Sequence, residues 1–202
     1  MSGLCLTLKS TTPDGKRETS MEPWKTIKSE YLFQDDWLTV RADKCLTPDG
    51  VVIDPYYILE RPDWVQVVAF DSEDKILTVR QFRQGEGRNS IEVPGGIIEP
   101  NETPLAAAKR ELIEETGCVA ERYEHLVSLN PNPAEQDNTM HCFMAFGTRT
   151  ERKPVLDETE NIESEFIEVS DLLRLIDQGQ FFHALHVSSI LLALRRRKIQ
   201  AW

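Results

Sequence analysis

Residues 94–118 read PGGIIEPNETPLAAAKRELIEETGC and decide how the chain folds around them. Thr103 can cap a helix that begins with Pro104, because threonine satisfies a free amide at a helix start and proline needs no partner there. Gly117 supplies the left-handed residue that ends a helix. The stretch therefore predicts a helix over 103–116, preceded by a Pro-Gly-Gly loop whose backbone can approach other groups closely.

The predicted helix carries three carboxylates on one narrow face. Glu111, Glu114 and Glu115 are spaced three and four residues apart, and like charges at this spacing destabilise a helix by roughly 0.2–0.5 kcal/mol per pair. The opposite side carries the apolar residues Leu105, Leu112 and Ile113. The acidic face is therefore expected to be exposed unless something neutralises it. A divalent cation with hard oxygen ligands would do so, and an ordinary solvated face is the alternative.

The composition limits the class of protein. The 202 residues are 40% hydrophobic and 28% charged, with 23 Lys plus Arg against 34 Asp plus Glu. The resulting net charge of -11 argues against a broad basic surface for nucleic acid or anionic lipid. No apolar run approaches the roughly 18 residues that a membrane span requires. A globular chain with a sizeable core is therefore expected.

The cysteines and the amino terminus bear on the compartment. Cys5, Cys45, Cys118 and Cys142 contain no Cys-x-x-Cys pair, which argues against both a zinc site and a disulfide framework. The apolar run over residues 4–8 is too short for a signal peptide. The expected location is the cytoplasm.

The amino-terminal part divides into two segments. Residues 1–20 show no periodicity and predict a flexible N-terminal extension. Residues 21–62 predict a small antiparallel β-subdomain, because strand-like alternation recurs over 24–27, 38–42 and 51–59. The sequence Pro-Asp-Gly over 48–50 is a turn between the last two segments.

The remaining residues, 63–202, predict one mixed α/β domain. Segments 64–70 and 75–82 flank a polar loop and predict a hairpin near the middle of a larger sheet. Further strands are expected at 90–93, 122–129, 140–147 and 164–169, and further helices at 170–178 and 184–197.

The charged residues of the opening stretch also match a known pattern. Gly96, five residues, Glu102, seven residues and the run RELIEETGC over 110–118 resemble the Nudix box of the Nudix hydrolases. All seven fixed letters agree, and the chance of such a match at one position is on the order of one in a billion. The closing aliphatic position holds Cys118, a departure that concerns packing. The resemblance implies an α/β fold, a Nudix-type α/β/α sandwich with a mixed sheet and the small N-terminal β-subdomain.

Nudix enzymes hydrolyse a diphosphate linked to a nucleoside, and the helix of the box holds the metal. The resemblance implies that Glu111 and Glu115 are the main metal ligands, with the Gly95 carbonyl as a third. Glu114 is similar to the third box carboxylate, which is a ligand or polarises a water molecule. The implied cofactor is Mg²⁺, with Mn²⁺ as the alternative.

The box also implies a role for Arg110, which is expected to orient a carboxylate through a charge-assisted hydrogen bond. Glu102 is expected to pair with Arg110 and to fix the loop against the helix. For Glu102 a purely structural role is at least as favoured as a catalytic one.

Residues outside the box indicate the branch of the family. Arg83, in the run RQFRQ over 80–84, resembles an arginine that contacts substrate phosphates in ADP-ribose pyrophosphatases, because a guanidinium grips a phosphate with two N–H groups. A salt-bridged surface arginine is the alternative. Pro133 lies at an offset from the box that resembles the same branch. Glu135 lies in a loop similar to one in nucleotide-sugar hydrolases, for which an ordinary surface turn is the alternative.

An acidic segment near residue 163 resembles the one that supplies the catalytic base or an extra metal ligand in ADP-ribose pyrophosphatases. Glu163 and Glu165 are the candidates on this resemblance, and Glu158 and Glu160 compete for the assignment. A solvated acidic loop is the alternative.

Aromatic residues of the early sheet resemble those that stack on the base in these enzymes, whose amino-terminal subdomain is exchanged across a homodimer. The candidates are Trp24, Tyr31 and Trp37, with core packing as the alternative. Three of the four histidines, His141, His183 and His186, are expected to be structural, because no metal-binding spacing connects them.

The combined expectation is a Mg²⁺-dependent Nudix pyrophosphatase that cleaves ADP-ribose or a related nucleoside diphosphate sugar into a nucleoside monophosphate and a sugar phosphate. Hydrolysis of GDP-mannose or of a dinucleoside polyphosphate is the alternative within the family. A sensor that binds a nucleotide sugar without cleaving it is the alternative from another class. The expected partners are a small-molecule substrate and a second copy of the chain, without nucleic acid or membrane.

Overall fold

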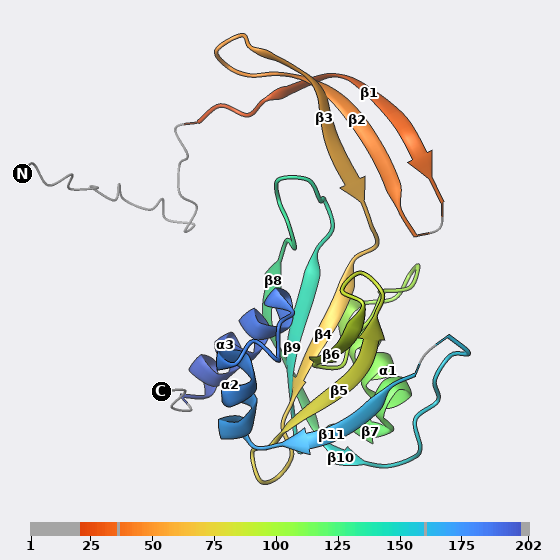
Figure 1. The fold of residues 1–202 in the computed structure, drawn as a ribbon, viewed down its shortest axis with the longest axis vertical. Coiled ribbons are helices and arrows are strands. Elements are labelled where there is room, and N and C mark those ends of the chain that lie inside the picture. Colours follow the sequence, from red (N-terminus) through yellow and green to blue (C-terminus); the bar gives the residue numbers. More distant parts are fainter. Residues whose placement is uncertain (1–20, 36, 160, 199–202) are drawn as a thin grey trace, which may run out of the picture.

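A computed structural model describes residues 21–35, 37–159 and 161–198. The predicted flexible extension over residues 1–20, including Cys5, and the candidate Glu160 lie outside the described residues. The first described region is an antiparallel sheet of three strands, β1 (Lys25–Gln34), β2 (Thr39–Leu46) and β3 (Val52–Glu60), in that order. Figure 1 shows that this N-terminal sheet projects from the rest of the molecule. The small antiparallel sheet expected from the sequence is therefore confirmed.

The body of the molecule contains two further sheets of three strands each. In the mixed sheet, β4 (Trp64–Ala69) pairs in parallel with β9 (Met140–Phe146), which pairs antiparallel with β8 (Arg122–Leu129). In the second sheet, β5 (Ile76–Arg83) lies between β11 (Glu163–Ile167) and β6 (Arg88–Glu92), and all its strands are antiparallel. A short pair joins β7 (Cys118–Val119) to β10 (Arg149–Thr150).

The expected hairpin of residues 64–70 and 75–82 is wrong. In the described part of the chain, β4 and β5 share one bridge, Phe70–Ile76, and then enter different sheets. The reason is burial: β4 is almost wholly buried, and a strand covered on both faces belongs beside another buried strand such as β9. The outer half of β5, from Arg80 onward, is exposed or only partly buried.

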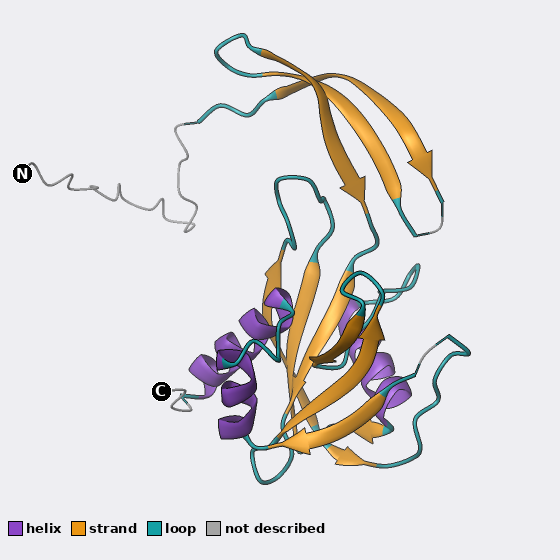
Figure 2. Ribbon diagram, viewed as in Figure 1, coloured by secondary structure: helices purple, strands orange, loops and turns teal. Residues whose placement is uncertain are grey.

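Helices cover the mixed sheet on both faces (Figure 2). Helix α1 (Pro104–Thr116) packs on one face, where Val65, Val67 and Leu112 share an apolar core. The helices α2 (Val169–Asp177) and α3 (Ala184–Arg197) contribute to a second core, which contains Val68 and Ile190. The predicted α/β/α sandwich is therefore confirmed. No described helix is long and apolar enough to cross a membrane.

Helix α1 begins and ends where the sequence predicts. The Thr103 side chain accepts a hydrogen bond from the Ala106 amide at 3.2 Å, and Gly117 ends the helix with a φ of 68°. The acidic side of the helix is not simply solvated, however. Glu115 is only 4% exposed, whereas the apolar Leu105 is 40% exposed. The acidic face is thus turned partly inward, which requires neutralising partners.

Candidate active site

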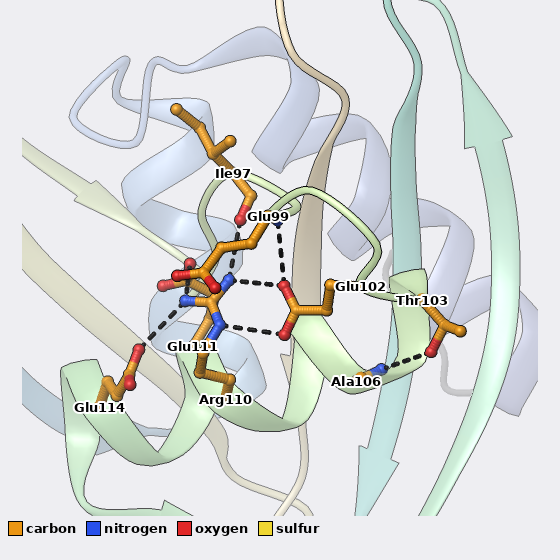
Figure 3. Close-up of polar contacts among 8 residues, drawn as sticks. All are labelled: Ile97, Glu99, Glu102, Thr103, Ala106, Arg110, Glu111 and Glu114. Carbon is orange, nitrogen blue, oxygen red and sulfur yellow. Dashed lines mark hydrogen bonds and ion pairs between the residues drawn. The ribbon is translucent and has the colours of Figure 1, made fainter.

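Arg110 supplies the positive charge at the centre of the acidic cluster (Figure 3). Its Nε and Nη2 donate to the two carboxylate oxygens of Glu102 at 3.0 and 2.9 Å. Its Nη1 donates to Glu111 at 2.7 Å and to Glu114 at 3.1 Å. The Arg110 guanidinium also holds the pKa of Glu102 below its usual range. The predicted Glu102–Arg110 pair is confirmed, and Arg110 partly resolves the conflict among the helix carboxylates.

The same residues attach the preceding loop to α1. Arg110 Nη2 donates to the Ile97 carbonyl at 2.9 Å, and the Glu99 amide donates to Glu102 Oε2 at 3.1 Å. Figure 3 shows the loop drawn over the start of the helix by these contacts. The guanidinium therefore organises both the carboxylates and the loop that faces them.

Gly95 and Gly96 lie so close to β4 and α1 that neither can carry a side chain. A Cβ atom on Gly95 would lie 2.1 Å from the Val65 carbonyl oxygen, and one on Gly96 would lie 2.3 Å from Glu111 Oε1. The Gly95 amide donates to Glu115 Oε2 at 2.9 Å. Both carboxylates predicted as main metal ligands thus lie against the glycine loop.

The donors assembled here suit a hard divalent cation. Glu111 and Glu115 offer carboxylate oxygens next to a loop that can offer backbone carbonyls, and Mg²⁺ prefers such oxygen ligands. The missing side chain of Gly96 leaves the space that the Glu111 carboxylate occupies. Among the described residues, no three His, Cys, Asp or Glu side chains form a ready metal cage. Arg110 binds Glu111 and Glu114 in this arrangement.

Arg83 forms a two-pronged ion pair with Glu92, through Nε–Oε1 and Nη2–Oε2 distances of 2.8 and 2.5 Å. Glu92 ends β6, and its side chain is 1% exposed. Burial alone would raise the pKa of Glu92, but the hydrogen bonds and charge of Arg83 outweigh burial and hold it at about 2. The pKa of Arg83 is raised by its hydrogen bond to Glu92 and also by the charge of Glu115. Arg83 therefore lies within electrostatic reach of the helix carboxylates.

Glu92 is not among the site residues expected from the sequence. The available signal was a carboxylate in the short strand expected at 90–93, two residues before Pro94, where its neighbours Ile91 and Val93 are apolar. A charge inside such a strand requires a partner. In the register of β5 and β6, Glu92 lies opposite Val79, and the Arg83 side chain, four residues farther along β5, reaches back to it.

Glu163 and Glu165 lie on β11 of the second sheet and not on α1. Neighbouring side chains of a strand alternate between its two faces, and Phe166 packs into the core beneath α1. The two carboxylates therefore share the other face, where they line a pocket of about 470 Å³. Glu165 lies 4.0 Å from the Arg80 guanidinium. The structure thus places this pair with Arg80 rather than with the Arg110 cluster.

The loop between β8 and β9 connects the body to the N-terminal sheet. The Leu59 amide of β3 donates to the Glu135 carbonyl at 2.6 Å, and Asn132 donates to the Glu135 carboxylate, also at 2.6 Å. Pro133 is exposed at the tip of this loop. The loop is therefore more than a free surface turn, since it joins β3.

Trp24 approaches the same loop through Tyr56. Its ring packs edge-on against the Tyr56 ring, with centroids 5.9 Å apart, and the Tyr56 hydroxyl donates to the Ala134 carbonyl. Tyr31 and Trp37, the other two candidates for stacking, are strongly exposed on or beside the N-terminal sheet. None of the three aromatic side chains is part of the core. Core packing, the alternative expected for each, is therefore not observed.

Comparisons with known proteins agree with this architecture. The NUDIX domain model matches residues 60–186, and the model of the nucleoside diphosphate sugar hydrolase N-terminal domain matches residues 24–59. The chain is 30% identical to an ADP-ribose pyrophosphatase of Bacillus subtilis (strain 168) over 178 residues, which cover 88% of this chain and 96% of that protein. It is also 30% identical to a methanol dehydrogenase activator of Bacillus methanolicus over 167 residues, or 82% and 90% of the two chains.

A solved structure of an ADP compounds hydrolase shares the fold, with a TM-score of 0.79 and 23% identity over 89% of this chain and 97% of that one. The match of the family model over most of the body coincides with the box whose arginine and carboxylates form the cluster on α1. The chain therefore belongs to the Nudix hydrolase family.

Proposed function

We propose that this Nudix hydrolase cleaves ADP-ribose or a related nucleoside diphosphate sugar into a nucleoside monophosphate and a sugar phosphate, with Mg²⁺ as the metal and Mn²⁺ as a substitute. The observation that carries the proposal is the complete carboxylate cluster of α1 against a glycine loop that tolerates no side chain. The relatives named ADP-ribose pyrophosphatase and ADP-sugar pyrophosphatase support the choice of substrate class.

In this proposal Glu111, Glu115 and the Gly95 carbonyl hold the metal, and Glu114 is a further ligand or polarises water. A bound divalent cation would neutralise diphosphate charge and make an activated water available for attack. Arg110 keeps the carboxylates oriented by its hydrogen bonds, so that they remain close together despite their repulsion.

Arg83 is the proposed contact to the diphosphate. Glu92 already uses its Nε and Nη2, so the remaining guanidinium donors are available to a phosphate oxygen. Its exposed side and its proximity to Glu115 support this role.

The catalytic base is assigned to the acidic segment that contains Glu163 and Glu165. Replacement of each by glutamine tests the assignment, because the amide keeps the shape and removes the basic oxygen. A matched control is Glu168→Gln, an exposed residue just beyond β11. Full activity in both Glu163→Gln and Glu165→Gln would transfer the role to Glu158 or Glu160.

We also assign the nucleoside end of the substrate to Trp24, Pro133 and Glu135: Trp24 packs on Tyr56, whose hydroxyl binds the Ala134 carbonyl between the other two. In this assignment residues 21–62 form a subdomain that contacts a second copy of the chain, and residues 63–202 form the hydrolase domain. Exposed apolar side chains along β1, including Tyr31, Leu32 and Phe33, support a homodimer.

The test of the function is phosphate release, coupled to alkaline phosphatase, from a panel of sugar nucleotides with Mg²⁺. The panel contains ADP-ribose, ADP-glucose, GDP-mannose, UDP-glucose, a dinucleoside polyphosphate and NADH. Preference for ADP-ribose is expected. Preference for GDP-mannose would instead follow the GDP-mannose pyrophosphatases of Salmonella, to which the chain is 25% identical over 167 residues. No release from any substrate by folded protein, with Mg²⁺ or Mn²⁺, would favour the sensor.

A further inference from the structure

A buried polar cluster lies between the active site and α3. Glu92 is its centre, because it bonds Arg83 on one side and faces His186 of α3 on the other. His186 is 2% exposed. Its ring centroid lies 4.3 Å from that of His183 and 6.0 Å from that of Trp64. A polar ring at such a buried position requires partners for both nitrogens.

The two nitrogens of His186 serve different parts of the active site. The Nδ1 atom accepts a hydrogen bond from the Val93 amide at 3.1 Å. Since Nδ1 is an acceptor, the proton of a neutral ring is on Nε2, and burial lowers the pKa of His186 to about 3. The Nε2 atom lies 3.3 Å from Glu92 Oε2, an electrostatic contact that does not have the geometry of a regular hydrogen bond.

Each of these two contacts of His186 connects it to one part of the proposed catalytic site. Through Glu92, the ring supports the carboxylate that holds the Arg83 guanidinium in two places. Through the Val93 amide, it fixes the backbone directly before the loop that places Gly95 against Glu115. The His186 side chain of α3 thus contacts both the carboxylate that binds Arg83 and the backbone that precedes the glycine loop. These two contacts are called the arginine arm and the glycine-loop arm below.

We propose that His186 is a positioning residue for hydrolysis, acting through Glu92 on Arg83 and through the Val93 amide on the glycine loop. The inference rests on the proposed function, because Arg83 is taken as the diphosphate contact. His186 touches no reacting atom, so its effect is transmitted by the two groups that it holds. Loss of a supporting partner of this kind typically costs about 10–100-fold in activity.

Three substitutions separate the two arms. His186→Leu removes both contacts and keeps an apolar side chain in the core. His186→Gln places an amide nitrogen near the former Nε2, so it retains the donor toward Glu92. His186→Asn places an amide oxygen near the former Nδ1, so it retains the acceptor for Val93. Ile190→Val, buried one turn farther along α3, is the matched control for core packing.

The expected result is a split between KM and kcat. His186→Leu raises KM and lowers kcat, on the order of 10–100-fold in kcat/KM. His186→Gln restores KM toward the wild-type value, and His186→Asn restores kcat. Ile190→Val leaves both constants within about twofold. A purely structural histidine would lower the amount of folded enzyme and leave KM unchanged in all variants.

A double-mutant cycle tests the transmission through Arg83. In the Arg83→Gln background, His186→Leu is expected to change KM by less than about twofold, because the arm it supports is already absent. Isothermal titration calorimetry with the non-hydrolysable methylene analogue of ADP-ribose should show the same coupling in Kd. Equal fold-changes in both backgrounds, for KM and Kd, would overturn the inference.

The failure of the inference is distinct from failure of the proposed function. A wild-type enzyme that hydrolyses the sugar nucleotide, with independent effects in the cycle, contradicts only the role of His186. A wild-type protein that binds the analogue but cleaves no substrate contradicts the hydrolase, and the Kd values then still decide whether His186 supports Arg83.

Discussion

The N-terminal sheet exposes apolar side chains, whereas the hydrolase body buries charged ones. Each is the opposite of the usual placement. On β1, apolar residues such as Tyr31, Leu32 and Phe33 are more than half exposed. In the body, the charged Glu92 and Glu115 are almost fully buried. The buried charges have partners within the chain, Arg83 and the Gly95 amide. Among the described residues, no apolar surface covers the exposed side chains of β1.

The two regions obtain their stability in different ways. A buried charge is tolerable when hydrogen bonds and an opposite charge replace water, and the body supplies both from its own elements. An apolar strand face in water gains free energy when another apolar surface covers it. The body thus satisfies its buried charges inside one chain, whereas the exposed apolar side chains of β1 would gain stability from contact with another apolar surface.

The largest expected effect is on catalysis in the body. Glu115→Gln keeps the size of the side chain but removes the negative charge against the Gly95 amide. We expect kcat to fall on the order of 10²–10³-fold with Mg²⁺, and the thermal unfolding curve to stay cooperative. Glu121→Gln, an exposed residue beyond α1, is the control. A fully active Glu115→Gln enzyme would contradict the metal assignment.

The next effect concerns neutralisation of the acidic cluster. Arg110→Met leaves Glu102, Glu111 and Glu114 without their shared cation, and the free energy of unfolding should fall by about 2 kcal/mol, less than for a fully buried pair because Arg110 is partly exposed. Addition of Mg²⁺ should restore part of the loss, since a bound cation stabilises the folded state.

Urea denaturation with and without Mg²⁺ measures this effect. Arg149→Met serves as the control, because Arg149 forms exposed ion pairs with Glu121 and Glu151. Equal stability of the two variants would show that Arg110 does not neutralise the cluster.

The exposed sheet provides the corresponding test in the other region. If β1 contacts a second copy, Phe33→Ser should weaken the dimer by about 2 kcal/mol, or roughly 30-fold in Kd. Light scattering after size-exclusion chromatography across a dilution series measures the shift, and Lys28→Ala on the same strand is the control. A wild-type monomer of 23.2 kDa at every concentration would refute the role assigned to the sheet.

The smallest effect is a pH dependence inside the body. His186 has a folded pKa of about 3, lowered by burial from 6.5. The unfolded histidine binds a proton as the pH falls below about 6.5 and the folded one does not, so stability rises with pH and is lost on acidification. The contribution is at most about 1.4 kcal/mol per pH unit.

Chemical denaturation between about pH 6.5 and 5 tests this dependence. His186→Gln should flatten the pH dependence of the free energy of unfolding, whereas Ile190→Val should shift the curve without changing its slope. An unchanged slope in His186→Gln would mean that the ring is protonated in the folded state.

Features encoded by neighbouring residues were predicted from the sequence, whereas contacts between distant segments were not. The helix of the box was predicted to within a residue because its cap, its proline and its terminal glycine are local signals. The pairing of β4 with β9 was missed, because that contact joins segments more than 70 residues apart. The inward position of Glu115 was expected only on condition that its charge is neutralised, since helical periodicity alone places like charges toward solvent.

The family, the positions of the box residues and the Glu102–Arg110 pair follow from local sequence, because their spacing along the chain is a covalent property of one loop and one helix. Tertiary packing was needed to show that Glu92 pairs with Arg83, that His186 of α3 contacts Glu92 and the Val93 amide, and that Glu165 lies beside Arg80. Those contacts depend on strand register and helix packing between distant segments. They are set by burial of the whole core, to which each local pattern contributes only a part.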